Sequence, residues 1–151
     1  MSHAIIEDPG NSILLMQLGM ALFAMGKYEA ASGVIQTGMH QLPSDHWGMV
    51  VTHYADFYAN PHEYTRHLQR LEQGVKAKPN DPAARFLLGY HYGYLGFFKQ
   101  SMEQLDKAIR IEPRDEMAKQ LLNEIKNRRS KPDSSYPAPQ PAKETSWTKS
   151  R

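Results

Sequence analysis

Hydrophobic residues recur at helical spacing through most of the first 130 positions of this chain. Leu15, Leu18, Gly19 and Leu22 follow the i, i+3, i+4, i+7 order of one helix face. Residues 115–129 repeat the pattern with an apolar stripe beside charged positions, as expected of a helix at the end of an array. The pattern predicts helices at residues 12–25, 28–41, 46–58, 61–76, 82–95, 98–110 and 115–129.

Residues typical of helix ends support these boundaries. Three dipeptides are suited to helix starts: Asn11-Ser12, Asn60-Pro61 and Asp81-Pro82. Gly26 and Gly96 are expected to end helices in the left-handed conformation that glycine adopts most easily.

The helical pattern is also repeated along the chain. Pro43, Pro79 and Pro113 are 36 and 34 residues apart. Small and large residues recur in the same register: Gly19, Ala55 and Gly89; Gly38, Gly74 and Ala108; Leu18, Tyr54 and Leu88. We expect the first set to let the two helices of a unit cross closely, the second to admit the next unit, and the third to fill the core.

This register resembles the tetratricopeptide repeat (TPR), a helix–turn–helix unit of about 34 residues. The matches in the first unit are Leu15, Leu18, Gly19, Leu22, Ala31, Ile35 and Pro43, and those in the third are Leu88, Gly89, Tyr92, Leu105 and Pro113. The second unit is degenerate. The resemblance implies an all-α fold, a right-handed superhelical array of antiparallel helix pairs. The expected organisation is an N-terminal segment 1–11, units at 12–45, 46–81 and 82–114, a capping helix 115–130 and a Pro/Ser-rich tail 131–151 that we expect to be disordered.

The resemblance also implies a ligand-facing groove on the first helix of each unit. Its candidate partner-binding residues are Ile13, Met16, Met20, Phe23, Met49, Thr52, Asp56, Asn60, Phe86, Tyr90 and Tyr94. Such a Met-rich and aromatic surface suits a peptide or an amphipathic helix. Two alternatives remain. Met16, Met20 and Phe23 are core residues covered by the N-terminal segment with Ile5 and Ile6 or by the proline-rich tail, or a second copy buries them.

The net charge of the chain is small, but charged residues are distributed unevenly along it. The net charge of +2 does not indicate a nucleic-acid partner. Residues 1–60 carry one basic and five acidic side chains, whereas residues 61–130 carry 13 and 9, an asymmetry that could orient a partner or a second copy. The sequence shows no signal peptide and no apolar run long enough to span a membrane, so we expect a cytoplasmic protein without a membrane partner.

Catalytic and metal-binding motifs are absent from the sequence. The 151 residues include no cysteine, and no phosphate-binding, nucleophile-elbow or zinc-protease motif occurs. His53, His62 and His67 could converge on a metal, but the spacing is poor, and His91 is expected to be a core histidine. We therefore expect no enzyme activity, no cofactor and no metal.

Some TPR proteins bind the C-terminal carboxylate of chaperones with basic side chains in the groove. The corresponding positions here are Met16, Met20, His53, Ala83 and Leu87, which lack those donors. The sequence therefore indicates a non-catalytic protein-interaction module that does not bind a chaperone tail in this way. The alternative function is a self-assembling repeat protein that uses the same apolar face.

Overall fold

The computed structural model describes residues 9–53 and 60–130 of the chain. Residues 1–8 of the predicted N-terminal segment 1–11, the tail 131–151 and the candidate residue Asp56 lie outside this range. The described elements are α2 (Pro9–Ala24), α3 (Tyr28–Gln41), the 3-10 turn η1 (Ser44–His46), α4 (Met49–Thr52), α5 (Pro61–Ala77), α6 (Pro82–Leu95), α7 (Phe98–Ile111) and α8 (Glu116–Ser130). The described residues are helices and connecting turns without strands, which confirms the all-α class.

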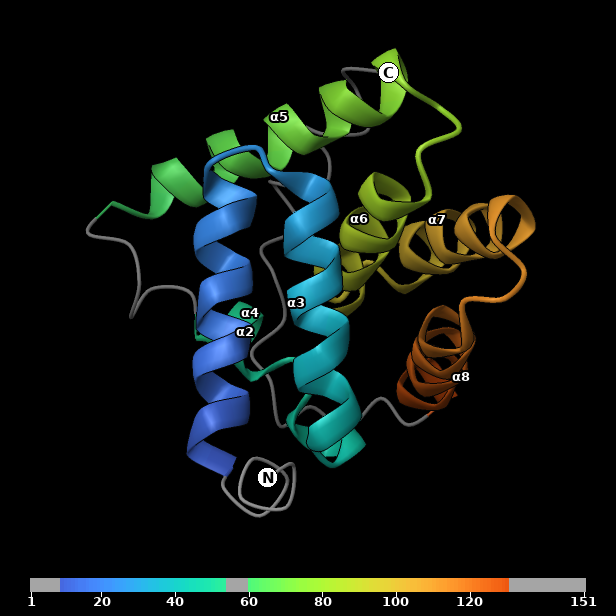
Figure 1. Cartoon of the computed structure of the whole chain (residues 1–151). Coiled ribbons are helices and arrows are strands. Elements are labelled where there is room, and N and C mark those ends of the chain that lie inside the picture. The colour runs from blue at the N-terminus through green and yellow to red at the C-terminus, as the bar shows by residue number, and fades with distance from the viewer. Residues whose placement is uncertain (1–8, 54–59, 131–151) are drawn as a thin grey trace.

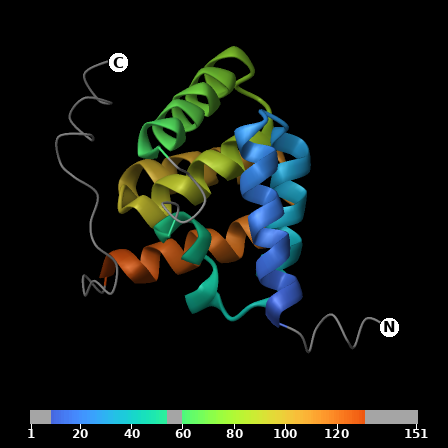
Figure 2. The same cartoon turned by 90° about the vertical axis from the view of Figure 1, so that its left-hand side faces the viewer.

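The helices form a three-tiered stack with one hairpin standing against it. Figure 2 shows α5 above the α6/α7 pair and α8 below that pair. The α2/α3 hairpin stands upright beside the stack, and α5 crosses the upper ends of α2 and α3 (Figure 1). The hairpin contacts the stack mainly through α3, which packs against α6. The Gln36 amide nitrogen also donates a hydrogen bond of 3.0 Å to the Asp115 carboxylate just before α8.

Most of the predicted helix ends are confirmed. Asn60 and Asp81 accept hydrogen bonds from backbone N–H groups of the first turns of α5 and α6. Gly26 and Gly96 have φ angles of +79° and +94°, the left-handed conformation expected at these helix ends. The predicted cap at Asn11-Ser12 is wrong, because α2 already begins at Pro9.

The first and third units have the same internal contact, which confirms the predicted close crossing. A Cβ atom on Gly19 would lie 2.5 Å from Ile35 Cδ1, and one on Gly89 would lie 2.7 Å from Leu105 Cγ. Both pairs are separated by 16 residues, and the second pair lies 70 residues after the first. Each hairpin therefore closes where a glycine of its first helix meets an aliphatic side chain of its second.

Gly38 does not have the predicted role of admitting the next unit. A Cβ atom on Gly38 would lie 2.6 Å from Met16 Sδ and 3.3 Å from the Ser12 carbonyl oxygen, both on α2. Ser12 is buried there and donates a hydrogen bond to Gln41. This small residue therefore tightens the first hairpin itself.

The continuous helix predicted at residues 46–58 is also wrong. The turn η1 is followed by the single-turn helix α4, and the described chain stops at residue 53. The Trp47 indole N–H donates to the carbonyl oxygens of Met39 and Leu42 at 2.8 and 3.0 Å, which ties this residue to the end of α3. The Met39 carbonyl also accepts the Leu42 backbone N–H, so the indole bonds hold Trp47 against the capped end of α3, and residue 47 does not continue into a long helix.

Candidate functional site

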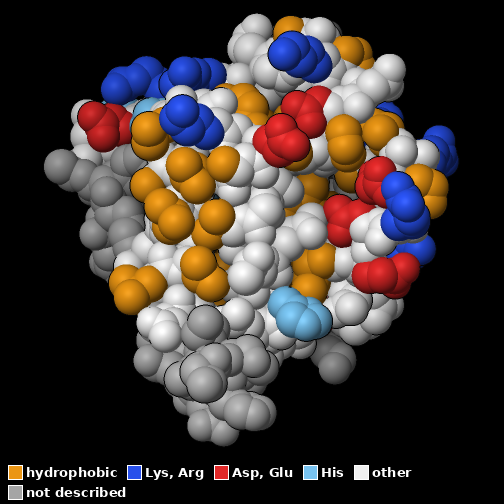
Figure 3. All heavy atoms as spheres, in the orientation of Figure 1, with side chains coloured by type: hydrophobic (Ala, Val, Ile, Leu, Met, Phe, Trp, Pro, Cys, Tyr) orange, Lys and Arg blue, Asp and Glu red, His pale blue; other side chains and the backbone are white. Residues whose placement is uncertain are grey.

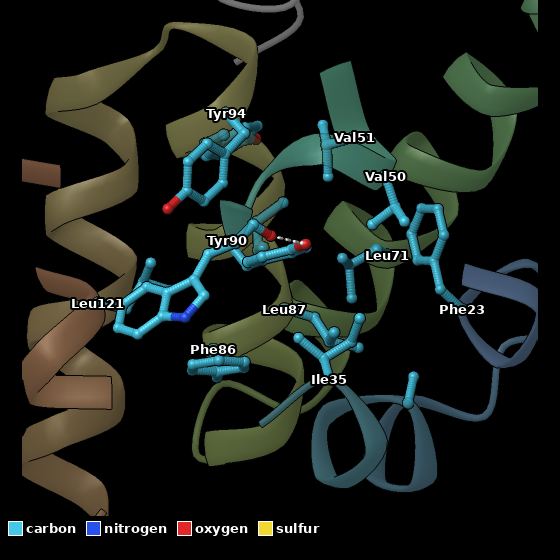
Figure 4. Packing of buried hydrophobic residues seen from close by; sticks show 14 of the residues in the cluster. Phe23, Ile35, Val50, Val51, Leu71, Phe86, Leu87, Tyr90, Tyr94 and Leu121 are labelled. Atoms are coloured by element: carbon cyan, nitrogen blue, oxygen red, sulfur yellow. Dashed lines mark hydrogen bonds between the residues drawn. The ribbon is translucent and has the colours of Figure 1, made fainter. Parts of the chain in front are cut away.

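Most of the predicted groove residues lie inside the protein. Figure 4 shows several of them packed with residues of α3, α4 and α5. Six of the eleven side chains are at most 5% exposed: Met16, Met20, Phe23, Phe86, Tyr90 and Tyr94. Side chains buried to this extent are core residues in the described structure. For Met16, Met20 and Phe23 a core position was one of the two alternatives, but the segments expected to cover them lie mostly outside the described residues.

The second unit fills the space where the groove was expected. The Tyr90 hydroxyl donates a 2.6 Å hydrogen bond to the Trp47 carbonyl oxygen. Gly48 lies directly against the Tyr94 ring, where a Cβ atom would overlap it. Val50 and Val51 of α4 are also buried in the same core. The segment from Trp47 to Val51 thus occupies the inner side of α6 and leaves no open groove over these residues.

The other described candidate residues are exposed or partly exposed. Ile13, Met49 and Thr52 are partly exposed, and Thr52 donates a hydrogen bond to the Met49 carbonyl oxygen. Asn60 is exposed, and its side chain caps α5. Ile13 lies on α2, Met49 and Thr52 form the ends of α4, and Asn60 precedes α5.

The predicted core position of His91 is confirmed. Its ring is 1% exposed, stacks on Phe23 with 4.2 Å between ring centroids, and shares a 2.7 Å hydrogen bond with the Tyr64 hydroxyl. Burial lowers the pKa of His91 to about 3, so the ring is neutral near pH 7. The trio links α2, α5 and α6 and is enclosed by the core, so it has a structural role.

Three histidines of the second unit were the candidate metal ligands. His53 and His62 are exposed, and His67 is partly buried. Within residues 9–53 and 60–130, no three side chains of the His, Asp or Glu type are grouped closely enough to hold a metal ion.

An apolar stripe on the outer face of α2 is the most distinctive surface feature. Leu14, Leu18 and Met25 are 61%, 47% and 57% exposed, and among the described residues they are the only exposed large hydrophobic side chains. Ala21 is exposed between them. Figure 3 shows hydrophobic side chains gathered over this part of the molecule. We call Leu14, Leu18 and Ala21 of α2, together with Met25 in the turn directly after it, the α2 stripe.

The sequence analysis missed this surface and placed Leu18 in the core. Two signals could have revealed it. The stripe has the spacing 4, 3, 4, which is that of a coiled-coil seam, and residues 9–26 contain no Asp, Glu, Lys or Arg. Both signals mark a helix that is apolar on more than its core-facing side.

Basic side chains lie at the C-terminal end of the α2 stripe. An Arg70 guanidinium nitrogen of α5 donates a hydrogen bond of 3.4 Å to the Ala24 carbonyl oxygen, and Lys27 follows in the turn. A cation at this position complements the negative end of the helix dipole. Nearby, burial raises the pKa of the Tyr28 hydroxyl, and the charge of Arg70 partly opposes that effect.

Among the described residues, no helix is both long enough and apolar enough to cross a bilayer.

Comparison with known proteins gives structural matches only. No family model and no curated protein sequence matches the chain. One similar solved structure is "MamA 41-end" from Desulfovibrio magneticus RS-1, with 27% identity, a TM-score of 0.44, and coverage of 82% of this chain and 67% of that one. Another is the first TPR domain of human RPAP3, with 19% identity, a TM-score of 0.45, and coverage of 85% and 100%.

A third similar structure is the first TPR of Spaghetti (RPAP3) bound to the HSP90 peptide SRMEEVD. It shares 19% identity over 82% of this chain and 96% of that chain, with a TM-score of 0.43. In this chain itself, the glycine crossings of α2/α3 and α6/α7 occupy the positions that the repeat register predicts. The described chain is therefore an all-α array in which the hairpins α2/α3 and α6/α7 repeat the same close crossing, in the register that resembles the TPR.

Proposed function

We propose that this protein is a non-catalytic protein-interaction module and that its binding surface is the α2 stripe. The observation that carries the proposal is the exposure of Leu14, Leu18 and Met25 on one face of a helix without charged side chains. Single exposed hydrophobic residues are common, but a contiguous apolar stripe is typical of an interaction surface.

The spacing of the stripe favours a helical partner. Residues that alternate at intervals of three and four pack into the face of another helix at a small crossing angle. The exposed Ala21 in the middle lets the partner helix approach closely. The partner surface would therefore be an apolar or amphipathic helix face.

A chaperone C-terminus does not fit this proposal. Of the five clamp positions, Met16, Met20 and Leu87 are buried, and none of the five carries a permanent positive charge. The groove-binding function expected from the sequence would require Trp47 and α4 to leave the core, so we favour the α2 stripe.

Binding can be tested by immobilising the full chain and identifying proteins captured from extracts of the cells that produce it. The test variant is Leu18→Glu, which places a charge in the middle of the stripe. The matched control is Gln120→Glu, which adds the same charge at an exposed position of α8. We expect Leu18→Glu to lose the captured partner, including any second copy of the chain, and Gln120→Glu to retain it. Capture that is equal for wild type and Leu18→Glu would contradict the proposal.

A further inference from the structure

We infer that the occupant of the α2 stripe is the same stripe of a second copy, with the two α2 helices antiparallel. This inference rests on the proposed function and names the partner. Its first support is the geometry of the seam. With Leu18 opposite the partner copy's Ala21, Leu14 meets the partner copy's Met25, so each end of the seam pairs large with large and the centre pairs large with small.

The flanks of the stripe permit a contact between identical helices. Coiled-coil partners are usually selected by charges beside the seam. Here those flanking positions are Leu15, Gln17, Leu22 and Ala24, all uncharged. Identical copies therefore meet without like-charge repulsion along the length of α2, and no charge pattern demands a different partner.

The two ends of the helix determine the orientation. In the sequence, Glu7 and Asp8 directly precede α2, and Lys27 directly follows its C-terminal turn. Arg70 adds a second positive charge at that end. An antiparallel pair brings the acidic end of one copy to the basic end of the other, whereas a parallel pair would bring like charges together.

The opposite end of the repeat array argues against head-to-tail stacking. Helix α8 buries Met117, Leu121 and Ile125 against the protein. Its exposed side chains are polar or charged: Glu116, Lys119, Gln120, Asn123, Lys126, Asn127, Arg129 and Ser130. Such a face would leave the α2 stripe of the next copy without an apolar partner, so a symmetric dimer is favoured over an open filament.

The size of the contact sets the expected strength. Helix α2 has 16 residues and is about 24 Å long at 1.5 Å per residue. A single pair of such helices is small compared with a stable dimer interface of about 1,200–2,000 Å². The dimer is therefore weak and dissociates on dilution.

Sedimentation equilibrium of the full chain over about 1 μM to 1 mM tests the inference directly, because a weak dimer dissociates within this range. We expect a reversible monomer–dimer equilibrium. Leu18→Glu should raise the dissociation constant by about 100-fold, since both copies lose the contact. Gln120→Glu should leave it within about twofold of wild type. Circular dichroism checks that both variants remain folded.

Disulfide trapping tests the orientation. Because the sequence has no cysteine, only the introduced thiols can form a disulfide. The two variants are Leu14→Cys and Met25→Cys. In the antiparallel dimer the two introduced thiols face each other only when the variants are mixed. Two Leu14→Cys chains would hold their thiols about 16 Å apart along the axis, beyond disulfide reach. A mixture of one tagged and one untagged variant should therefore give the mixed dimer in excess.

The outcomes separate this inference from the proposed function. A protein that is monomeric at the highest concentration, or single variants that link to themselves as readily as to each other, would overturn the antiparallel dimer. If such a monomer still captures a different protein in a Leu18-dependent manner, the proposed function stands. If neither self-association nor capture depends on Leu18, both fail.

Discussion

The first helices of the two complete hairpins, α2 and α6, have matching registers but different surroundings. A shift of 70 residues pairs the α2 stripe with α6: Leu14 with Ala84, Leu18 with Leu88, Ala21 with His91, and Met25 with Leu95. All four residues of the α2 stripe are exposed, whereas Ala84, Leu88 and His91 are buried and Leu95 is partly buried. The same helix face is therefore a surface in one hairpin and part of the core in the other.

The difference comes from the elements that precede each helix. On α6, the face is covered by α5 through Tyr64 and by Phe23 of α2, both of which contact His91. In the described residues, α2 is the first helix of the chain. The outer face of α2 is apolar, as expected of a helix inside a protein, but it lies at the surface. We therefore propose that a partner covers it.

The strongest test makes the same substitution at the two equivalent leucines. Leu88 is 3% exposed, so Leu88→Glu places a carboxylate in the core, and we expect it to lower the free energy of unfolding by about 4 kcal/mol or more. Leu18→Glu should change it by less than about 1 kcal/mol, since that side chain is 47% exposed. Urea denaturation at low protein concentration measures both.

Equal destabilisation of the two variants would contradict the difference in burial between the α2 and α6 faces. That result would mean that the outer face of α2 is covered within the monomer.

The second test uses the pH dependence of the α6 face. His91 has a folded-state pKa of about 3 against an ordinary value of 6.5, so the unfolded chain binds a proton more readily. Stability is therefore full above pH 6.5 and falls as the pH drops toward 3. We expect His91 to account for a loss of about 3 kcal/mol between pH 7 and pH 4. Urea denaturation at each pH measures this slope.

Other groups also titrate in this range, so a variant isolates the contribution of His91. His91→Gln retains a hydrogen-bonding side chain beside Tyr64 but has no titrating ring. Its stability should fall less steeply between pH 7 and pH 4 than that of the wild type. Equal slopes would show that His91 is not enclosed as described.

A third test addresses what α2 and α6 share, namely the close crossing within each hairpin. In Gly89→Ala the new methyl group would meet Leu105 at 2.7 Å and the Ser101 carbonyl oxygen at 3.2 Å. We expect overpacking to cost about 2 kcal/mol. Thermal unfolding followed by circular dichroism gives the size of the effect, and Gly19→Ala should behave in the same way because Ile35 blocks it.

The smallest expected effect is that of Gly33→Ala, the matched control for these glycines. Gly33 lies within α3, is exposed, and has no atom within 4 Å of a Cβ position. Alanine should stabilise the helix there by about 0.5–1 kcal/mol. Destabilisation measured in the same thermal scan would indicate that something in the protein covers this part of α3.

The parts of the fold that sequence could predict depend on neighbouring residues. Helix periods, the Asn60 and Asp81 caps and the left-handed glycines involve contacts within a few positions, and the structure confirms them. The helix at residues 46–58 failed because Trp47 hydrogen-bonds to carbonyls at the end of α3, and Gly48 packs against Tyr94, 46 residues away. The sequence around residues 46–58 does not indicate these contacts with residues elsewhere in the chain.

The candidate site shows the same division. The sequence by itself determined that α2 is apolar on more than one face, through its hydrophobic spacing and its lack of charge. Only the tertiary structure decided that Met16, Met20 and Phe23 point into the core and that Leu14, Leu18 and Met25 face outward. The physical reason is that composition and spacing set how many faces of a helix favour burial, whereas the elements that pack around it decide which faces are covered.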